Sequence, residues 1–195
     1  MSADMIEARN YAILASLFGM RHKSMLETPS LIIQHFKDSK FDFKFIHSKQ
    51  NKTGTECYVP ILLPVLNIIN ENGGTLPIVR DNANTNKTIK LLFKNVGIND
   101  QVVITNYTYK RGVIKEKNTL DQVITTHDFR SSFKSNLASR ISDDVTESIL
   151  HPEKGKNKVS KLYDKLTMLD KAKAFIQEIK EFNKDEEKRS AIYTL

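Results

Sequence analysis

The spacing of the apolar residues changes along this chain of 195 residues, and this change constrains the fold more than any other feature. In residues 127–141, apolar side chains recur every four positions, as Phe129 and Phe133 do, which is typical of a buried helix face. In residues 41–49, apolar side chains alternate with polar ones, which is typical of a strand with one buried face. The presence of both patterns in one chain predicts an α+β fold.

Helical patterns dominate the rest of the chain. They cover 5–18, 30–36, 63–74, 86–95, a segment that begins after Ser142, 159–169 and 170–182. Two strand pairs are expected, one formed by 41–49 and 55–61 and one within 101–117. The expected architecture is therefore mostly α: a helical bundle with a small antiparallel β-sheet or hairpin near the N-terminal part.

The length of the chain favours one domain, over residues 1–185, followed by a C-terminal tail over 186–195. No apolar run approaches the roughly 20 residues of a membrane span, and no secretory signal begins the chain. The single cysteine, Cys57, excludes a disulfide framework and a zinc site with several cysteines. These features predict a chain with no membrane partner.

The charge of the chain favours a polyanionic partner. Lysine and arginine number 30 against 23 aspartates and glutamates, so the net charge is +7. A composition rich in lysine and asparagine is also typical of AT-rich genomes, so charge alone leaves nucleic acid binding open.

Four segments carry the residues that suggest chemistry. They are AILASLFGMRHKSML with Arg21, HSKQNKTGTECYVPI with Lys52, THDFRSSFKSNL with His127 and Arg130, and SILHPEKGKNKVSKLYDK with His151 and Tyr163. In this order and spacing they resemble the catalytic domain of the tyrosine recombinases, the phage-integrase-like site-specific recombinases. The resemblance covers about residues 5–168 and implies that family's catalytic fold.

The resemblance implies cleavage of a DNA phosphodiester through a covalent 3′-phosphotyrosine, without a metal or another cofactor. Tyr163 would be the nucleophile, and Arg21 and Arg130 would bind the non-bridging phosphate oxygens. Lys52 would protonate the leaving 5′-oxygen, with Lys49 as a rival for this role.

The two histidines complete the implied site. His127 would accept the tyrosine proton or hold the phosphate, and His151 would donate a hydrogen bond to a phosphate oxygen. The sequence departs from the family at Ser24, where a carboxylate is usual, and at Leu150, where glycine is usual. The 12 positions from His151 to Tyr163 are also a few more than usual.

The implied partner is double-stranded DNA, bound by a homotetramer, although the isolated domain could be a monomer. The implied location is the cytoplasm, at the nucleoid, in a bacterium, phage or mobile element. We expect the chain to lack the family's N-terminal core-binding domain. Two alternatives stay open: a type IB topoisomerase that relaxes DNA, and a non-catalytic DNA-binding relic of an integrase.

The apolar tip of the tail predicts a docking segment. Ile192, Tyr193 and Leu195 follow a charged spacer, and burial of apolar area is favourable by roughly 25 cal/mol per Å². We expect them to pack into an apolar groove, in trans within an assembled complex or in cis in the isolated domain. The alternative is a frayed chain end.

Overall fold

The structure is a computed structural model of the chain. It describes residues 2–27, 31–49, 56–109, 112–138, 140–150, 167–185 and 192–195. About half of these residues are helical, and the remainder includes two small antiparallel sheets, so the α+β class is confirmed.

The first half of the chain supplies two helices, a sheet and two further helices. These elements are α1 (Ala3–Phe18), α2 (His22–Met25), β1 (Ile33–Lys37), β2 (Asp42–Lys49), β3 (Glu56–Pro60), α3 (Leu63–Glu71) and α4 (Asn82–Asn95). The second half begins with a separate strand pair and continues with helices. These elements are β4 (Gln101–Thr108), β5 (Gly112–Thr119), α5 (Leu120–Val123), α6 (Thr126–Leu137), α7 (Asp143–Leu150) and α9 (Met168–Phe182).

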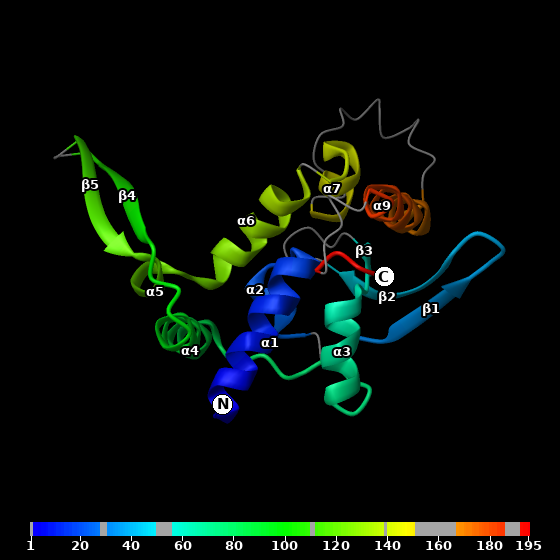
Figure 1. Cartoon of the computed structure of the whole chain (residues 1–195), viewed down its shortest axis with the longest axis horizontal. Coiled ribbons are helices and arrows are strands. Elements are labelled where there is room, and N and C mark those ends of the chain that lie inside the picture. The colour runs from blue at the N-terminus through cyan, green and yellow to red at the C-terminus, as the bar shows by residue number, and fades with distance from the viewer. Residues whose placement is uncertain are drawn as a thin grey trace.

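Helix α1 lies at the centre of the helical part (Figure 1). It packs against α6, α4 and α3, and its Leu14 and Phe18 are fully buried. Helix α6 presents Phe129, Phe133 and Leu137 to the core, as the four-residue spacing predicts. The side of α1 that faces α6 therefore forms much of the core that supports the candidate site.

The three-stranded sheet has the order β1-β2-β3, with both pairs antiparallel. Helix α9 packs against β3, and α7 packs against both of them. The rings of Phe133 in α6 and Phe175 in α9 are stacked with centroids 6.5 Å apart. This contact joins the helical part to the part built around the sheet.

Strands β4 and β5 form a separate two-stranded ribbon. They pair from Gln101↔Thr119 to Thr108↔Gly112, and Figure 1 shows the ribbon projecting from the molecule beyond α5 and α6. Gly112, with a φ of 65°, begins β5 in the left-handed region that favours glycine. The strand pair expected within 101–117 is thus confirmed.

One expected element is wrong. The segment expected as a helix over 30–36 instead contains β1, whose Ile33 and Phe36 pair with Ile46 and Phe43 of β2. The turn between the strands is fixed by Asp38, whose carboxylate accepts hydrogen bonds from two backbone N–H groups, 2.7 and 2.8 Å away. Pairing with a strand already rich in phenylalanine thus outweighs the weak local helical pattern.

The other expected elements that the structure describes match in type, whereas the short helices α2 and α5 were not expected. Helix α4 begins four residues earlier than expected because Asp81 caps it through the N–H groups of Ala83 and Asn84. Helix α9 begins at Met168 because Thr167 and Asp170 form a capping box. The helical stripe expected over 159–169 lies mostly outside the described residues.

The tail docks in cis through one of its three apolar residues. Tyr193 is buried, whereas Ile192 and Leu195 are exposed. The Arg140 guanidinium lies 5.0 Å from the Tyr193 ring and 5.4 Å from the Phe182 ring. Docking in cis is therefore confirmed for Tyr193 and does not occur for Ile192 and Leu195, whereas docking in trans stays a prediction.

Candidate active site

Arg21 follows a sharp end of helix α1. Gly19 adopts a φ of 59°, and its N–H donates to the Ala15 carbonyl over 3.1 Å, which closes the helix. Two residues later Arg21 begins the short helix α2 as its N-cap residue. The left-handed glycine thus turns the chain so that Arg21 lies beside the C-terminal end of α1.

Arg130 reaches the same point from α6. The start of α6 is fixed by Thr125 and Asp128, because the Asp128 carboxylate accepts from the Thr125 N–H and hydroxyl, each over 2.7 Å. Arg130 is the fifth residue of α6 and is only 8% exposed. Its Nη1 donates a hydrogen bond to the Gly19 carbonyl at the end of α1.

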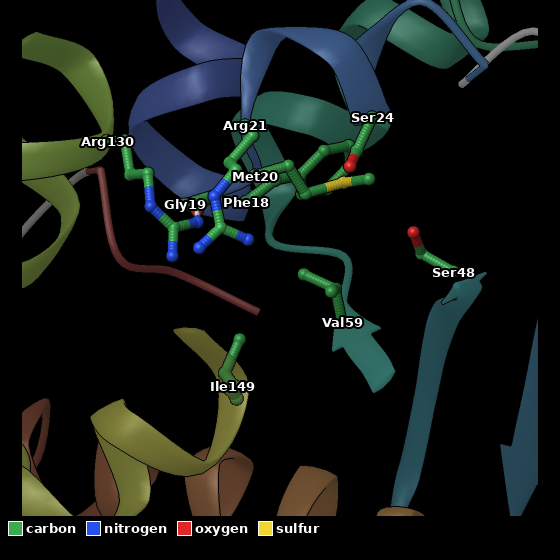
Figure 2. Close-up of a pocket in the computed structure, with 9 residues that line it drawn as sticks. All are labelled: Phe18, Gly19, Met20, Arg21, Ser24, Ser48, Val59, Arg130 and Ile149. Carbon is green, nitrogen blue, oxygen red and sulfur yellow. Dashed lines mark hydrogen bonds between the residues drawn. The ribbon is translucent and has the colours of Figure 1, made fainter. Parts of the chain in front are cut away.

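The two arginines line one pocket. Figure 2 shows both guanidinium groups at the same end of this pocket, Arg21 from α2 and Arg130 from α6. The described lining consists of Phe18, Gly19, Met20, Arg21, Ser24, Ser48, Val59, Arg130 and Ile149. This set contains two cations and no carboxylate, so the described lining is positively charged and suited to an anion.

Strands β2 and β3 contribute the opposite wall of the pocket through Ser48 and Val59 (Figure 2). These strands flank residues 50–55 in the chain, which include Lys52. Lys52 itself lies outside the described residues, and so does the side chain of its rival Lys49. The described arms of the hairpin therefore reach the pocket of the two arginines.

Helix α7 contributes Ile149, which lies two positions before His151 in the sequence. His151 and Tyr163 both fall within 151–166, outside the described residues. The structure thus brings together Arg21 and Arg130, and the predictions for Lys52, His151 and Tyr163 stay predictions.

His127 lies one helical turn before Arg130, in the first turn of α6. Residues three apart share one side of a helix, so His127 and Arg130 project from adjacent positions. The His127 side chain is exposed and does not belong to the described pocket lining. The structure therefore places His127 beside the pocket rather than in its wall.

Ser24, at the position where the resemblance to the recombinases would imply a carboxylate, is buried and lines the same pocket. Its backbone N–H donates to the Arg21 carbonyl over 2.9 Å, within the turn that forms α2. A small neutral side chain at this position adds no negative charge beside Arg21. Ser24 thus leaves the described lining of the pocket without a negative charge.

A partly buried polar network joins the two arginine-bearing segments. The Tyr11 hydroxyl of α1 lies 3.1 Å from His22 Nδ1, next to Arg21 in the chain. Tyr11 also hydrogen-bonds Thr126, in the first turn of α6, and burial raises the pKa of Tyr11 well above its usual range. Tyr11 thereby links α2 to the helix that carries Arg130.

Two asparagines of α4 complete this network. The Thr126 hydroxyl donates to Asn82 and the Thr126 N–H donates to Asn86, each over 2.8 Å. Sequence reasoning missed these residues, because an aromatic residue in an amphipathic helix and asparagines on another give no local signal. The one feature of the sequence that could have pointed to this network is the position of His22 directly after Arg21.

Two further findings concern metals and membranes. Within the described ranges, no three histidine, cysteine, aspartate or glutamate side chains are grouped closely enough to hold a metal ion. Among the helices that the structure describes, none is long and apolar enough to cross a membrane.

No protein-family model, curated protein or solved structure matches this chain. Function is therefore inferred from the residues of the chain itself and from the order of its four motifs.

Proposed function

We propose that this chain cleaves and rejoins double-stranded DNA as a site-specific recombinase, through a covalent 3′-phosphotyrosine intermediate. The observation that carries the proposal is the convergence of Arg21 and Arg130 in one pocket. The sequence motifs predict that these two arginines bind the phosphate, although they lie 109 positions apart (130 − 21). Their meeting in one pocket supports the motif assignment, because unrelated arginines would have no reason to converge.

Arginine suits the proposed role of both residues. Its planar guanidinium donates two parallel hydrogen bonds to phosphate and stays charged at all working pH values. The bond from Arg130 Nη1 to the Gly19 carbonyl holds one nitrogen in place and so orients the group. Preorganised cations of this kind stabilise the charge that develops on the non-bridging oxygens in the transition state.

The proposed reaction is a transesterification at phosphorus. The Tyr163 oxygen forms a bond to phosphorus, the bond from phosphorus to the 5′-oxygen breaks, and the total number of phosphoester bonds is unchanged. His127 accepts the tyrosine proton or holds the phosphate, and Lys52 gives a proton to the leaving 5′-oxygen. His151 donates a hydrogen bond to a phosphate oxygen. Attack by a 5′-hydroxyl on the phosphotyrosine then rejoins a strand.

The positions of β2, β3 and α7 also support this proposal. Ser48 and Val59 bring the two arms of the hairpin that carries Lys52 to the pocket wall, and Ile149 brings the end of α7, which precedes His151. The resemblance to the tyrosine recombinases further implies that the partner is duplex DNA, bound by an assembly of four copies, at the nucleoid of a bacterium, phage or mobile element.

The decisive experiment traps the intermediate on a nicked duplex, from which the short cleaved strand diffuses away. The wild-type chain is expected to form a covalent protein–DNA adduct. Tyr163→Phe is expected to form none and to bind DNA almost as well, because only the phenolic oxygen is removed. Tyr109→Phe, at a fully exposed tyrosine, is the matched control and is expected to form the adduct normally.

The outcomes separate the alternatives. An adduct with Tyr163→Phe would show that another tyrosine is the nucleophile. Adduct formation with relaxation of supercoiled plasmid but no strand exchange would favour a type IB topoisomerase. DNA binding without any adduct, also when the chain is joined to a core-binding domain, would favour a non-catalytic relic of an integrase.

A further inference from the structure

The ribbon formed by β4 and β5 has no evident role in the pocket of Arg21 and Arg130. It projects from the molecule, and its main contact beyond the pairing of its own strands is with the short helix α5 that follows it (Figure 1). Eight paired residues in each strand give a ribbon about 26 Å long. Isolated two-stranded ribbons are marginally stable in water, so its extent points to a binding role.

The two faces of the ribbon differ in chemistry. The strand register and the alternation of side chains place one set of six residues on a single face, which we call the basic face: Val103, Thr105, Tyr107, Val113, Lys115 and Lys117. The opposite face carries Glu116, the one acidic residue between 101 and 119, with half-buried Val102, Ile104 and Ile114.

The basic face is open to solvent. Tyr107 is 81% exposed, and Val103 and Val113 are 59% and 55% exposed. Lys115 and Lys117 are exposed as well. Two valines, a tyrosine and two lysines thus form a solvated surface that mixes apolar and positive groups and contains no carboxylate.

We propose that the β4–β5 ribbon is a second DNA-binding element, which lies in the major groove of the duplex with its basic face toward the DNA. The major groove is wide enough for a two-stranded β-ribbon. Lysine, threonine and tyrosine donate hydrogen bonds to phosphates, and threonine also bonds base edges. Apolar side chains such as Val103 and Val113 contact thymine methyl groups.

Charge complementarity selects nucleic acid over a second copy of this chain. Residues 101–119 contain four basic residues and one acidic residue, a net charge of +3 (4 − 1). Two basic faces in contact would bring like charges together, whereas the phosphates on either side of the groove would neutralise them. The choice of duplex DNA over RNA rests on the proposed function.

The test compares DNA affinity in two charge-matched double variants of the full chain. Lys115→Ala/Lys117→Ala removes two charges from the basic face. Lys40→Ala/Lys184→Ala removes two exposed lysines elsewhere, in the β1–β2 turn and after α9. The probe is a labelled duplex of about 30 base pairs, long enough to span the pocket and the ribbon at 3.4 Å per pair. Affinity is measured by fluorescence anisotropy over a salt series.

The ribbon variant is expected to bind at least about tenfold more weakly at low salt, with a slope of log affinity against log salt reduced by about 2. The control variant is expected to keep most of the wild-type affinity and slope. Equal losses in the two variants, or none in either, would overturn the proposal. So would a ribbon variant that binds DNA normally but loses self-association in sedimentation, since the basic face would then contact another copy.

The nicked-duplex experiment keeps this proposal separate from the proposed function. Weaker binding of the ribbon variant, with no adduct from the wild-type chain even when it is joined to a core-binding domain, would support the ribbon and overturn the recombinase assignment. A Tyr163-dependent adduct, with full DNA affinity in the ribbon variant, would support the recombinase assignment and overturn the proposal for the ribbon. The lysines replaced in the two double variants are all exposed, so both variants are expected to unfold at the same temperature as the wild-type chain. A thermal melt checks this expectation.

Discussion

Arg130 combines burial with a fixed orientation, and this combination predicts how it responds to substitution. A lysine keeps the positive charge but loses the planar fork that binds two phosphate oxygens and the bond to the Gly19 carbonyl. Arg130→Lys is therefore expected to slow adduct formation almost as much as Arg130→Ala, by about a hundredfold or more. Single-turnover rates at saturating DNA measure this effect.

Lys134→Ala is a suitable control for that measurement. Lys134 lies one turn further along α6, is exposed and forms a surface ion pair with Glu147. Its loss is expected to leave the rate of adduct formation close to wild type. If Arg130→Lys instead recovers most of the rate, Arg130 serves general attraction of phosphate and not the geometry of the transition state.

The environment of His22 predicts that the stability of the folded chain depends on pH. Burial lowers its pKa below the usual 6.5, although Asp81 and a backbone hydrogen bond partly oppose this shift. The folded state then binds fewer protons than the unfolded state, so stability is complete above about pH 6.5 and declines as the pH falls below it. Thermal melts between about pH 7 and pH 5 are expected to show this decline. Most carboxylates stay charged in this range, so they contribute little to it.

His22→Gln is expected to flatten the decline, because glutamine keeps a polar group near Tyr11 but does not titrate. His127→Gln is the control, since His127 is exposed and is expected to leave the decline unchanged. Equal pH dependence in the wild-type chain and His22→Gln would assign the effect to other groups.

Among the elements near the chain end, Tyr193 is part of the core. Besides the Arg140 contact, the Tyr193 carbonyl accepts from Asn183 over 2.6 Å, and the Thr194 carbonyl accepts from the Leu63 N–H over 2.8 Å. Burial also raises the pKa of Tyr193. These bonds connect the chain end to the end of α9 and the start of α3.

Tyr193→Ala is accordingly expected to lower the free energy of unfolding by about 3 kcal/mol, as for other buried aromatic residues. Leu195→Ala, at an exposed neighbour, is expected to change it by less than about 0.5 kcal/mol. Urea unfolding measures both. Equal small effects would mean that the tail contributes little in solution.

At the scale of the whole molecule, the pocket is assembled from four separate parts of the chain. The end of α1 with α2, the strands β2 and β3, helix α6 and helix α7 each contribute to its wall. The stacked Phe133 and Phe175 rings and the buried face of α1 hold these parts together. The pocket therefore depends on the complete core, and the ribbon is the part that stands outside it.

Elements with strong local patterns can be predicted from the sequence. The spacing of Phe129 and Phe133 predicted α6, the alternation in 41–49 predicted β2, and the motif order selected Arg21 and Arg130. These features were readable because helix and strand periods and turn residues are local properties of a few neighbouring positions.

The tertiary structure alone decided the features that join distant segments. Residues 33–37 became a strand because β2 offered a partner, and Tyr193 became buried because α9 and Arg140 form its site. The bond from Arg130 to Gly19 spans 111 positions. Such contacts arise when separate segments pack against one another, and no local spacing in the sequence records which segments will meet.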